Sequence, residues 1–516
     1  MGEWMDSYLK RLAKNREENQ MGGGPDRIAV QHGLGKLTAR ERIQRLLDPD
    51  SFEELGSLVR DPYNSKVSNP KASPADGVVM GIGKINGRLT ALYSLDFTVM
   101  SGSIGDQGVW KIAELVQIAG QEKIPLIGII DSAGSRLSFK GGMLGLNGLG
   151  RLIRNYSLYS GIIPQITLLL GPCTGPFSQI AALSDFLIMN QRTGFLWLGG
   201  AIESEDAGSA EFHMVKAGQC DLIADSDEEA LELAQKILGF IPQNCWEKPT
   251  PVKSSDDPKR REEALLEVMP NNPKFTYDMH EVIELISDNG EFFEIKADFA
   301  PNLIIGFARF DGLVTGIAAS NPDELSGIME PDSSDKYDKF MMFLDAFTIP
   351  LLTISDTTAY PPGDKWERMG VIRHGAKNLH GYSHLTNPKV TLVLRRSYGG
   401  SNITMGCSKM GPDFIFGWPT TEFAPTGPEA IVQAIFNKEL AKAREEGKYE
   451  ELYNALLIPL KEQFSVMNMG RAFTTYYTVH EVIDPRDTRI HIIKALHAAA
   501  NKTEELPDKK RFIKPA

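Results

Sequence analysis

A glycine-containing turn after the apolar run 163–170 is the stretch best suited to chemistry. The run IPQITLLL is rich in β-branched and leucine residues, which predicts a strand buried on both faces of a sheet. Gly171, Gly175 and two prolines predict a turn after it, and residues 178–183 can then begin a helix whose first amides have no partner within the helix. Such amides can donate to an anion or to a reaction's oxyanion. The alternative is that the segment is only a strand-to-helix connection.

The same segment occurs a second time along the chain. Residues 387–405 repeat the order of proline, β-branched strand and turn, and Gly399-Gly400 falls where Gly175-Pro176 stands. Two blocks further upstream also match, and the partners are separated by 225 or 224 residues throughout. A constant spacing of this length predicts two duplicated domains rather than a short repeat. We therefore expect one pocket in each half, with related functions. The upstream pairs are IPLIGIIDSAGSR with IPLLTISDTTAYPPG, and GKINGRLTALYS with ARFDGLVTGIAAS.

The sequence lacks the usual metal and nucleophile motifs. His280-Glu281 and His480-Glu481 have no second histidine at the spacing of a zinc protease. No G-x-S-x-G motif occurs either. We therefore expect no metal site.

Isolated polar residues offer little more. Asp356 follows an apolar strand, where it is either a general base or a turn residue that caps Thr357 or Thr358. His213 and His374 stand alone, and for both we favour a structural role. Chemistry by backbone amides therefore remains.

The elements that position these turns follow an α/β pattern. Residues 75–95 predict a hairpin, with Asn86-Gly87 in a tight type I′ turn. A helix over 109–120 and a buried strand over 124–130 come next. Further elements are predicted as helices over 227–238, 277–286 and 441–464, a strand over 220–223, and a strand and helix within 482–499.

Two helices are predicted before the first hairpin. Residues 1–19 have Trp4 and Tyr8 on one side, and a capping box at 38–41 begins the second helix. We expect both helices to pack against the first domain, and Arg42 to serve packing rather than a ligand.

A linker separates the two halves. Residues 242–261 are rich in proline, lysine and acidic residues. We place an N-terminal helical segment at 1–74, the first α/β domain at 75–250 and the second at 262–516.

The composition is that of a soluble, reduced protein. The 516 residues carry a net charge of −12, which gives no bias toward nucleic acid, and 42% of them are hydrophobic. The four cysteines form no C-x-x-C pair, so neither a zinc site nor a disulfide framework is expected. The start lacks the apolar core of a signal peptide, and the cytoplasm is the simplest compartment.

Many ordered blocks resemble one family, the carboxyltransferase subunits of biotin-dependent acyl-CoA carboxylases and decarboxylases. This family includes the propionyl-CoA carboxylase beta subunit, the transcarboxylase large subunit and the alpha subunit of glutaconyl-CoA decarboxylase. The resemblance covers about residues 27–495. It rests on RIAVQHGLGKLTARERIQRLLDPDSFEE, IPLIGIIDSAGSR, GIIPQITLLLGPCTG, GFARFDGLVTGIAASNP, DAFTIPLLTISDTTAYPPG, GVIRHGAKNLHGY, NPKVTLVLRRSYGGS and EVIDPRDTR.

The resemblance implies two crotonase-like domains, with an acyl-CoA held by the first half and biotin by the second half of a neighbouring subunit. Carboxyl transfer develops negative charge on an enolate oxygen and on a ureido oxygen, and each needs its own amide donors. By this analogy the acyl-CoA residues are Ser101, Gly102, Ser103, Ala133, Gly134, Ser135, Thr174 and Gly175, and the biotin residues are Thr358, Ala359, Gly399, Gly400 and Ser401.

Two blocks of the first half depart from the family pattern. The usual D-S-G-G-A-R and Q-E-G become DSAGSR and SFKG, and the usual C-A-G-G-A becomes CTGPF. Pro176 has no N–H to donate. We therefore predict that the amides of Ser135 and Gly175 hold the acyl oxygen, with the Pro176 ring to one side.

Two functions are consistent with the sequence. The first is a carboxyltransferase subunit that carboxylates an acyl-CoA or decarboxylates a dicarboxylic thioester. The second is a biotin-independent hydrolase or isomerase of the crotonase type. For the first, the resemblance implies a separate biotin carboxyl carrier, further partners such as a biotin carboxylase or membrane decarboxylase subunits, and a homo-oligomer, by analogy a hexamer.

Overall fold

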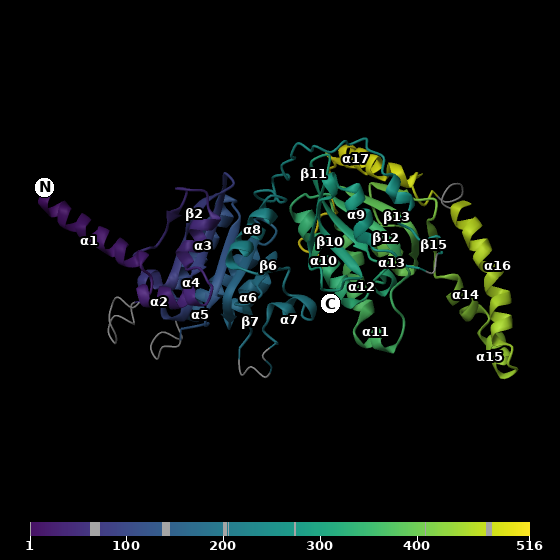
Figure 1. The fold of residues 1–516 in the computed structure, drawn as a ribbon, viewed down its shortest axis with the longest axis horizontal. Coiled ribbons are helices and arrows are strands. Elements are labelled where there is room, and N and C mark those ends of the chain that lie inside the picture. The colour runs from purple at the N-terminus through teal and green to yellow at the C-terminus, as the bar shows by residue number, and fades with distance from the viewer. Residues whose placement is uncertain are drawn as a thin grey trace. The chain divides into compact units, whose positions relative to one another are not determined.

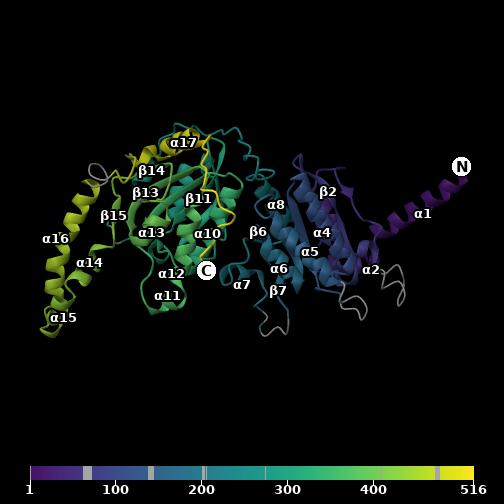
Figure 2. The ribbon, with the colours of Figure 1, turned by 180° about the vertical axis from the view of Figure 1, so that it is seen from behind.

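The computed structural model describes residues 2–61, 73–136, 145–199, 204, 206–272, 275–407, 409–470 and 477–515. The chain divides into two compact units, Met1–Lys248 and Pro249–Ala516 (Figures 1 and 2). The predicted N-terminal segment thus falls within unit 1. No helix in the described ranges combines the length and the apolar character needed to cross a bilayer.

Unit 1 is built on one mixed sheet. Its strand order is β1-β2-β3-β4-β5-β6-β8, and β7 pairs with β5 beyond the end of β6. Strands β1 to β3 are antiparallel, and the rest of the sheet from β3 onward is parallel. The predicted hairpin is confirmed, since Asn86 and Gly87 both have positive φ and their N–H groups donate to the Asp48 carboxylate at 2.9 and 2.8 Å. The strands are β1 (Glu53–Glu54), β2 (Val78–Ile85), β3 (Arg88–Leu95), β4 (Leu126–Ser132), β5 (Gln165–Thr174), β6 (Phe186–Asn190), β7 (Phe195–Trp197) and β8 (Leu222–Ala224).

Helices cover both faces of this sheet. Apolar residues of α4 and α5 pack with the strands in one buried core, while α3 and α8 pack together and against the strands elsewhere. The capping box at Thr38 and Glu41 is present. Helices α2, α5 and α7 are additions that the sequence pattern did not predict. The helices are α1 (Gly2–Gln20), α2 (Pro25–Gly33), α3 (Ala39–Leu46), α4 (Asp106–Glu122), α5 (Gly145–Tyr159), α6 (Pro176–Leu183), α7 (Ala210–Val215) and α8 (Asp227–Leu238), with 3₁₀ turns at Pro74–Gly77 and Met100–Gly102.

Strand β5 runs further than predicted. The turn was expected at Gly171, yet the strand continues to Thr174. A Cβ atom on Gly171 would lie 1.9 Å from Oδ1 of Asp131, so this glycine permits close approach to a side chain rather than a change of direction. The turn therefore begins at Gly175.

Unit 2 repeats the architecture of unit 1. Its strand order is β16-β14-β13-β12-β11-β10-β9, and β15 pairs with β13 as β7 does with β5. Strands β9 to β11 are antiparallel and the others parallel. The predicted duplication of an α/β domain is confirmed. The strands are β9 (Phe292–Ile295), β10 (Leu303–Phe310), β11 (Leu313–Ser320), β12 (Leu351–Thr357), β13 (Lys389–Tyr398), β14 (Phe414–Gly417), β15 (Glu422–Ala424) and β16 (Glu481–Val482).

The helices of unit 2 include an extension that unit 1 lacks. The predicted helix over 441–464 is divided, because Gly447 has a φ of 73° and ends α15 before α16 begins. Helices α9 and α17 share one buried core with the strands. The helices are α9 (Met279–Ile286), α10 (Pro331–Ala346), α11 (Asp364–Arg368), α12 (Val371–Tyr382), α13 (Gly399–Thr404), α14 (Pro428–Ile435), α15 (Asn437–Glu445), α16 (Tyr449–Gly470) and α17 (Thr488–Ala499), with 3₁₀ turns at Glu263–Leu266, Asp288–Gly290, Leu325–Gly327 and Pro485–Asp487.

A buried lysine marks the same place in both units. Lys111 on α4 donates to two backbone carbonyls at 2.8 and 2.7 Å, and Lys336 on α10, 225 positions later, donates to two others at 2.8 and 2.7 Å. Burial lowers the pKa of Lys111 to about 8 and that of Lys336 to about 7. The duplication therefore extends to individual polar contacts.

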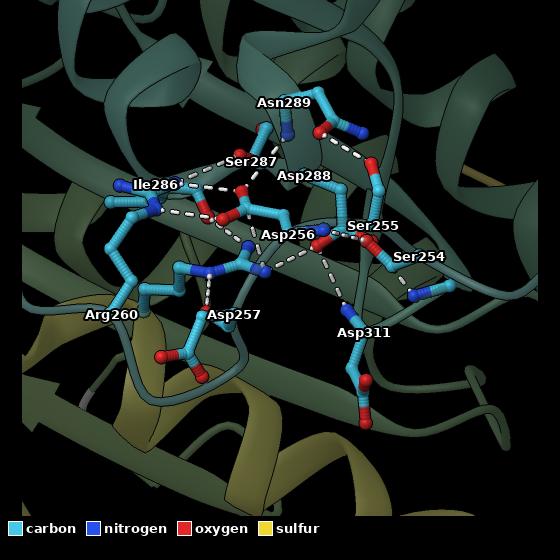
Figure 3. A network of polar contacts seen from close by, with 12 residues as sticks. Ser254, Ser255, Asp256, Asp257, Arg260, Ile286, Ser287, Asp288, Asn289 and Asp311 are labelled. Carbon is cyan, nitrogen blue, oxygen red and sulfur yellow. Dashed lines mark hydrogen bonds and ion pairs between the residues drawn. The ribbon is translucent and has the colours of Figure 1, made fainter.

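Part of the predicted linker is bound to unit 2 (Figure 3). Arg260 forms two hydrogen bonds with Asp256, both of 3.0 Å, and donates to the Leu285 carbonyl at 3.0 Å. The Asn289 N–H also donates to Asp256 at 3.0 Å. The hydrogen bond from Arg260 is the main reason that the pKa of Asp256 falls to about 2. The chain near residue 256 is thus part of the second unit's surface.

Next to this contact, Asp288 fixes the hairpin of unit 2. Its carboxylate accepts the N–H groups of Asp311 and Gly312 at 2.9 and 2.8 Å, as Asp48 does in unit 1. Arg489 of α17 donates to the same carboxylate at 2.6 Å. The C-terminal helix is thereby tied to the start of the sheet.

The exposed half of α1 departs from the prediction. Trp4 and Tyr8 were expected to pack on the first domain, yet they are 63% and 53% exposed. The end of the helix is held in place, because Asn19 donates to the Ser57 carbonyl at 2.5 Å.

Candidate active sites

The first site forms where β4 and β5 end side by side. These strands are parallel neighbours, so residues 133–135 and 174–176 leave the sheet at the same edge. A Cβ atom on Gly134 would lie 2.7 Å from the Thr174 hydroxyl oxygen, which leaves room for glycine only. The two loops predicted for the acyl-CoA are thus in contact.

Segment 101–103 lies against the first of these loops. The Ser101 carbonyl accepts the Ala133 N–H at 3.0 Å, and Arg136 donates to the Ser103 carbonyl at 2.7 Å. A Cβ atom on Gly102 would lie 2.0 Å from the Asp131 carbonyl oxygen, so only glycine permits this approach. The structure therefore brings this predicted segment to the same place.

The amides of the first site are not equally available. The Ala133 N–H is taken by Ser101, and the Gly134 N–H donates to the Ser132 hydroxyl at 3.0 Å. The Gly175 N–H donates to the Trp197 carbonyl at 3.2 Å, because β7 extends the sheet along this part of β5. Gly175, which the sequence predicts as a donor to the acyl oxygen, thus donates its N–H to a backbone carbonyl in this structure.

Two amides of the first site have no acceptor within the described part of the chain. Ser135 lies opposite Ile104 in an isolated β-bridge. In this bridge the Ile104 N–H donates to the Gly134 carbonyl and the Arg136 N–H donates to the Ile104 carbonyl, so the Ser135 N–H stays unpaired. Phe177 is the second residue of α6, where helix geometry provides no acceptor. Sequence reasoning missed Phe177, although Pro176 at the first helical position was a signal that the next residue carries the first available N–H.

The second site has the same construction in unit 2. Residues 358–360 and 399–401 follow the parallel neighbours β12 and β13. A Cβ atom on Gly399 would lie 3.8 Å from that of Ala359, and one on Gly400 would lie 3.2 Å from the Tyr360 ring. The predicted biotin loops are thus in contact. The Ala359 carbonyl accepts the Met329 N–H at 3.2 Å, as the Gly134 carbonyl accepts that of Ile104 at 2.9 Å.

This second site presents backbone amides from both of its loops, as the first does. The Tyr360 N–H has no acceptor among the described residues, and Gly399 and Gly400 are the first two residues of α13, where the helix provides no acceptor for their N–H groups. The Tyr360 hydroxyl pairs with the Thr404 hydroxyl at 2.6 Å, which holds its ring over Gly400. Tyr360 was missed because the family pattern drew attention to Thr358 and Ala359.

A buried carboxylate anchors the strand that leads into each site. Asp131 accepts hydrogen bonds from Lys36 at 2.7 Å and Arg42 at 3.0 Å. Asp356, 225 positions later, accepts from Arg395 at 3.1 Å and from the Arg396 side chain at 3.0 Å. Both sequence interpretations of Asp356, a general base or a turn cap, were therefore wrong, because its oxygens are occupied by arginines. Arg42 serves packing, as expected.

The histidines lie in structural contacts. His213 contacts the Leu196 carbonyl at 2.9 Å, and burial lowers its pKa. His374 contacts Asp335 at 2.8 Å. Among the described residues, no group of three or more His, Cys, Asp or Glu side chains is placed to hold a metal ion.

The comparison with known proteins agrees with this geometry. The model of the carboxyl transferase domain matches residues 30–513. The propionyl-CoA carboxylase beta chain of Roseobacter denitrificans is 36% identical over 520 residues, which are 98% of this chain and 99% of that protein. The methylmalonyl-CoA decarboxylase alpha subunit of Veillonella parvula is 36% identical over 518 residues, 98% of each chain.

A solved structure extends the likeness to the fold. The transcarboxylase 12S subunit, whose crystal structure is described as a hexamer with methylmalonyl-CoA and methylmalonic acid bound, has a TM-score of 0.89 at 37% identity and covers 99% of both chains. Each unit thus has the crotonase-like fold. The chain belongs to the carboxyl transferase family. Within it, the chain is a biotin-dependent acyl-CoA carboxyltransferase, which decides between the two functions left open by the sequence.

Proposed function

We propose that unit 1 binds the acyl-CoA and unit 2 binds biotin carried on a separate polypeptide, and that the acyl group is short. The observation that carries this assignment is the pair of amide-lined turns at equivalent positions of the two sheets. The propionyl and methylmalonyl groups named in the relatives support a short acyl chain.

On the acyl side, the residues of unit 1 stabilise an enolate. Breaking a bond at the α-carbon of a thioester moves negative charge onto the carbonyl oxygen, and two positioned N–H donors can hold it. The unpaired amides of Ser135 and Phe177 take this role in our proposal. Pro176 begins α6, where a missing N–H costs nothing, and its ring narrows the space for the acyl group.

On the biotin side, the residues present fit a ureido oxygen. The Tyr360 N–H has no acceptor among the described residues, those of Gly399 and Gly400 lie at the start of α13 without an acceptor in the helix, and the Tyr360 ring covers one side of the loop. Biotin, when bound, supplies a ureido nitrogen that accepts or releases the carboxyl group. The amides of Gly399 and Gly400 hold the neighbouring oxygen, and the ring of Tyr360 limits access of water.

The test is an assay with free biotin in place of the carrier. The chain is incubated with methylmalonyl-CoA, and propionyl-CoA and free thiol are measured with and without biotin. We expect biotin-dependent formation of propionyl-CoA and no release of thiol. Release of free coenzyme A without biotin would show a hydrolase and contradict the proposal.

The partners are proposed from the family. Biotin arrives on a separate carrier, so a streptavidin blot of the purified chain stays blank, and a band mapping to Lys409 would contradict this. A homohexamer is supported by the assembly of the transcarboxylase 12S subunit. Light scattering that finds an active monomer would refute it. All four cysteines are free thiols, which supports a reducing compartment such as the cytoplasm.

A further inference from the structure

A pair of hydroxyl groups joins the two loops of the second site. The Tyr360 hydroxyl lies 2.6 Å from the Thr404 hydroxyl, and the Thr404 hydroxyl donates to the Gly400 carbonyl at 3.2 Å. A threonine hydroxyl has one hydrogen, which here goes to Gly400, so the Tyr360 hydroxyl is the donor of the shorter bond. Tyr360 follows β12 and Thr404 ends α13, so this bond connects one loop to the helix that begins at the other.

The Tyr360 ring lies between two glycines on different helices. A Cβ atom on Gly375 of α12 would lie 2.9 Å from the ring carbon Cζ, and one on Gly400 of α13 would lie 3.2 Å from the ring carbon Cδ2. Distances this short leave little room for a side chain at either position. The ring is therefore confined on both sides, and a displacement of the ring would move the backbone of residue 360 and its N–H.

The surroundings of the hydroxyl keep its proton in place. Burial raises the pKa of Tyr360, and this effect exceeds the opposite effect of Thr404 and Asn378 beside it. Thr404 and Asn378 are completely buried. Neither polar atom of the Asn378 side chain is engaged by another residue in the described part of the chain, so this amide is available to the tyrosine hydroxyl. A neutral hydroxyl in such a network fixes geometry rather than transferring a proton.

The equivalent positions of unit 1 carry different side chains. At the spacings of the duplication, Ser135 corresponds to Tyr360 and Ile180 corresponds to Thr404. Ile180 is completely buried in the apolar core of unit 1 and its side chain has no polar group. The hydroxyl pair is thus a feature of the second site and not of the duplicated fold.

We propose that Tyr360 and Thr404 are positioning residues for biotin: the bond between their hydroxyls fixes the separation between the Tyr360 N–H on one loop and the N–H groups of Gly399 and Gly400 on the other. The inference rests on the proposed function, because it assigns biotin to unit 2. Neither hydroxyl contacts biotin. Negative charge on the ureido oxygen grows in the transition state, so an error in the separation of the donors lowers kcat more than it weakens binding.

The test uses the full chain with free biotin and methylmalonyl-CoA, and propionyl-CoA is the measured product. Tyr360→Phe keeps the ring and removes the hydroxyl. It should lower kcat with biotin by roughly 10- to 100-fold and leave the KM for biotin and the KM for methylmalonyl-CoA near the wild-type values. Thr404→Val should have the same effect, and the double variant should lose no more than either single variant, because each removes the same bond. Thr404→Ser keeps the hydroxyl and should recover most of the wild-type kcat.

The matched control is Tyr337→Phe. Tyr337 on α10 is completely buried and its hydroxyl pairs with that of Thr353 at 3.4 Å, yet neither residue belongs to a loop of the second site. This variant loses a hydroxyl of the same kind, so its thermal unfolding measures the structural cost of that loss. Its kcat with biotin should equal that of the wild type.

Three results would overturn the proposal: an unchanged kcat in Tyr360→Phe, additive losses in the double variant, or an equal loss of kcat in Tyr337→Phe. If Tyr360→Phe does not fold, Thr404→Val and Thr404→Ser decide, and equal kcat values in these two variants would also overturn it. A failure of the proposed function gives a different result. A wild-type chain that forms propionyl-CoA at the same rate without biotin would refute that function, and this inference with it.

Discussion

Replacing Arg42 by methionine tests the anchor of the first site. Arg42, Asp131 and Asp227 are completely buried, and Arg42 bonds to the two carboxylates at 3.0 and 2.9 Å. In the wild type, the positive charges of Lys36 and Arg42 neutralise the negative charges of Asp131 and Asp227. Without Arg42 one buried carboxylate lacks a counter-charge, which typically costs about 3 to 5 kcal/mol.

The loss should be visible as a large shift in thermal unfolding. For a domain of this size, roughly 2 to 4 °C is lost per kcal/mol, so we expect Arg42→Met to lower the Tm by roughly 6 to 20 °C. The matched control is Arg45→Met on the same helix, because Arg45 and its partner Glu228 are 53% and 42% exposed. An exposed pair contributes at most about 1 kcal/mol. Equal shifts in the two variants would refute the reasoning.

Three further predictions concern single groups. Hydrogen bonding to Glu294 raises the His280 pKa to about 9, so His280→Gln should lower the free energy of unfolding below about pH 6.5. In urea titrations, the difference in this free energy between variant and wild type should vanish as the pH rises through about 9. Burial lowers the Lys336 pKa to about 7, so the free energy of unfolding of the wild type should rise between about pH 7 and 10 by at most about 1.4 kcal/mol per pH unit. Lys336→Met should lack this dependence on pH. Pro176→Ala adds one N–H to α6. Because the Phe177 N–H already donates to the acyl oxygen in our proposal, kcat with the preferred acyl-CoA should change by less than about tenfold. A gain in kcat above about 100-fold with every acyl-CoA would show that the site lacked a donor.

The duplicated architecture could be read from the sequence because it depends on strong local patterns. The pair Asn86-Gly87 specifies its turn by backbone preference, and the constant spacing between the halves requires only matching strands. The contact of the loops near Gly134 and Thr174 follows from parallel strand order. These features depend on neighbours in sequence or on general topology.

The hydrogen-bond state of individual amides could not be predicted. The Gly175 N–H is occupied because the three-residue strand β7 pairs with the end of β5. No sequence pattern predicts the register of this pairing, that is, which residue of β7 lies opposite which residue of β5. The role of Asp356 was missed for the same reason, since its partners Arg395 and Arg396 become neighbours only through the sheet. Long-range pairing thus decides which candidate groups remain available.

The two anchoring carboxylates give the halves unequal autonomy. Asp356 takes its counter-charges from β13 of its own unit, whereas Asp131 takes them from Lys36 and Arg42, upstream of the first hairpin. A fragment that begins at residue 75 would lack both cations, while one that begins at residue 249 keeps both arginines. In a recombined protein, the second half therefore brings the counter-charges of its buried carboxylate with it, whereas the first half does so only together with its N-terminal extension.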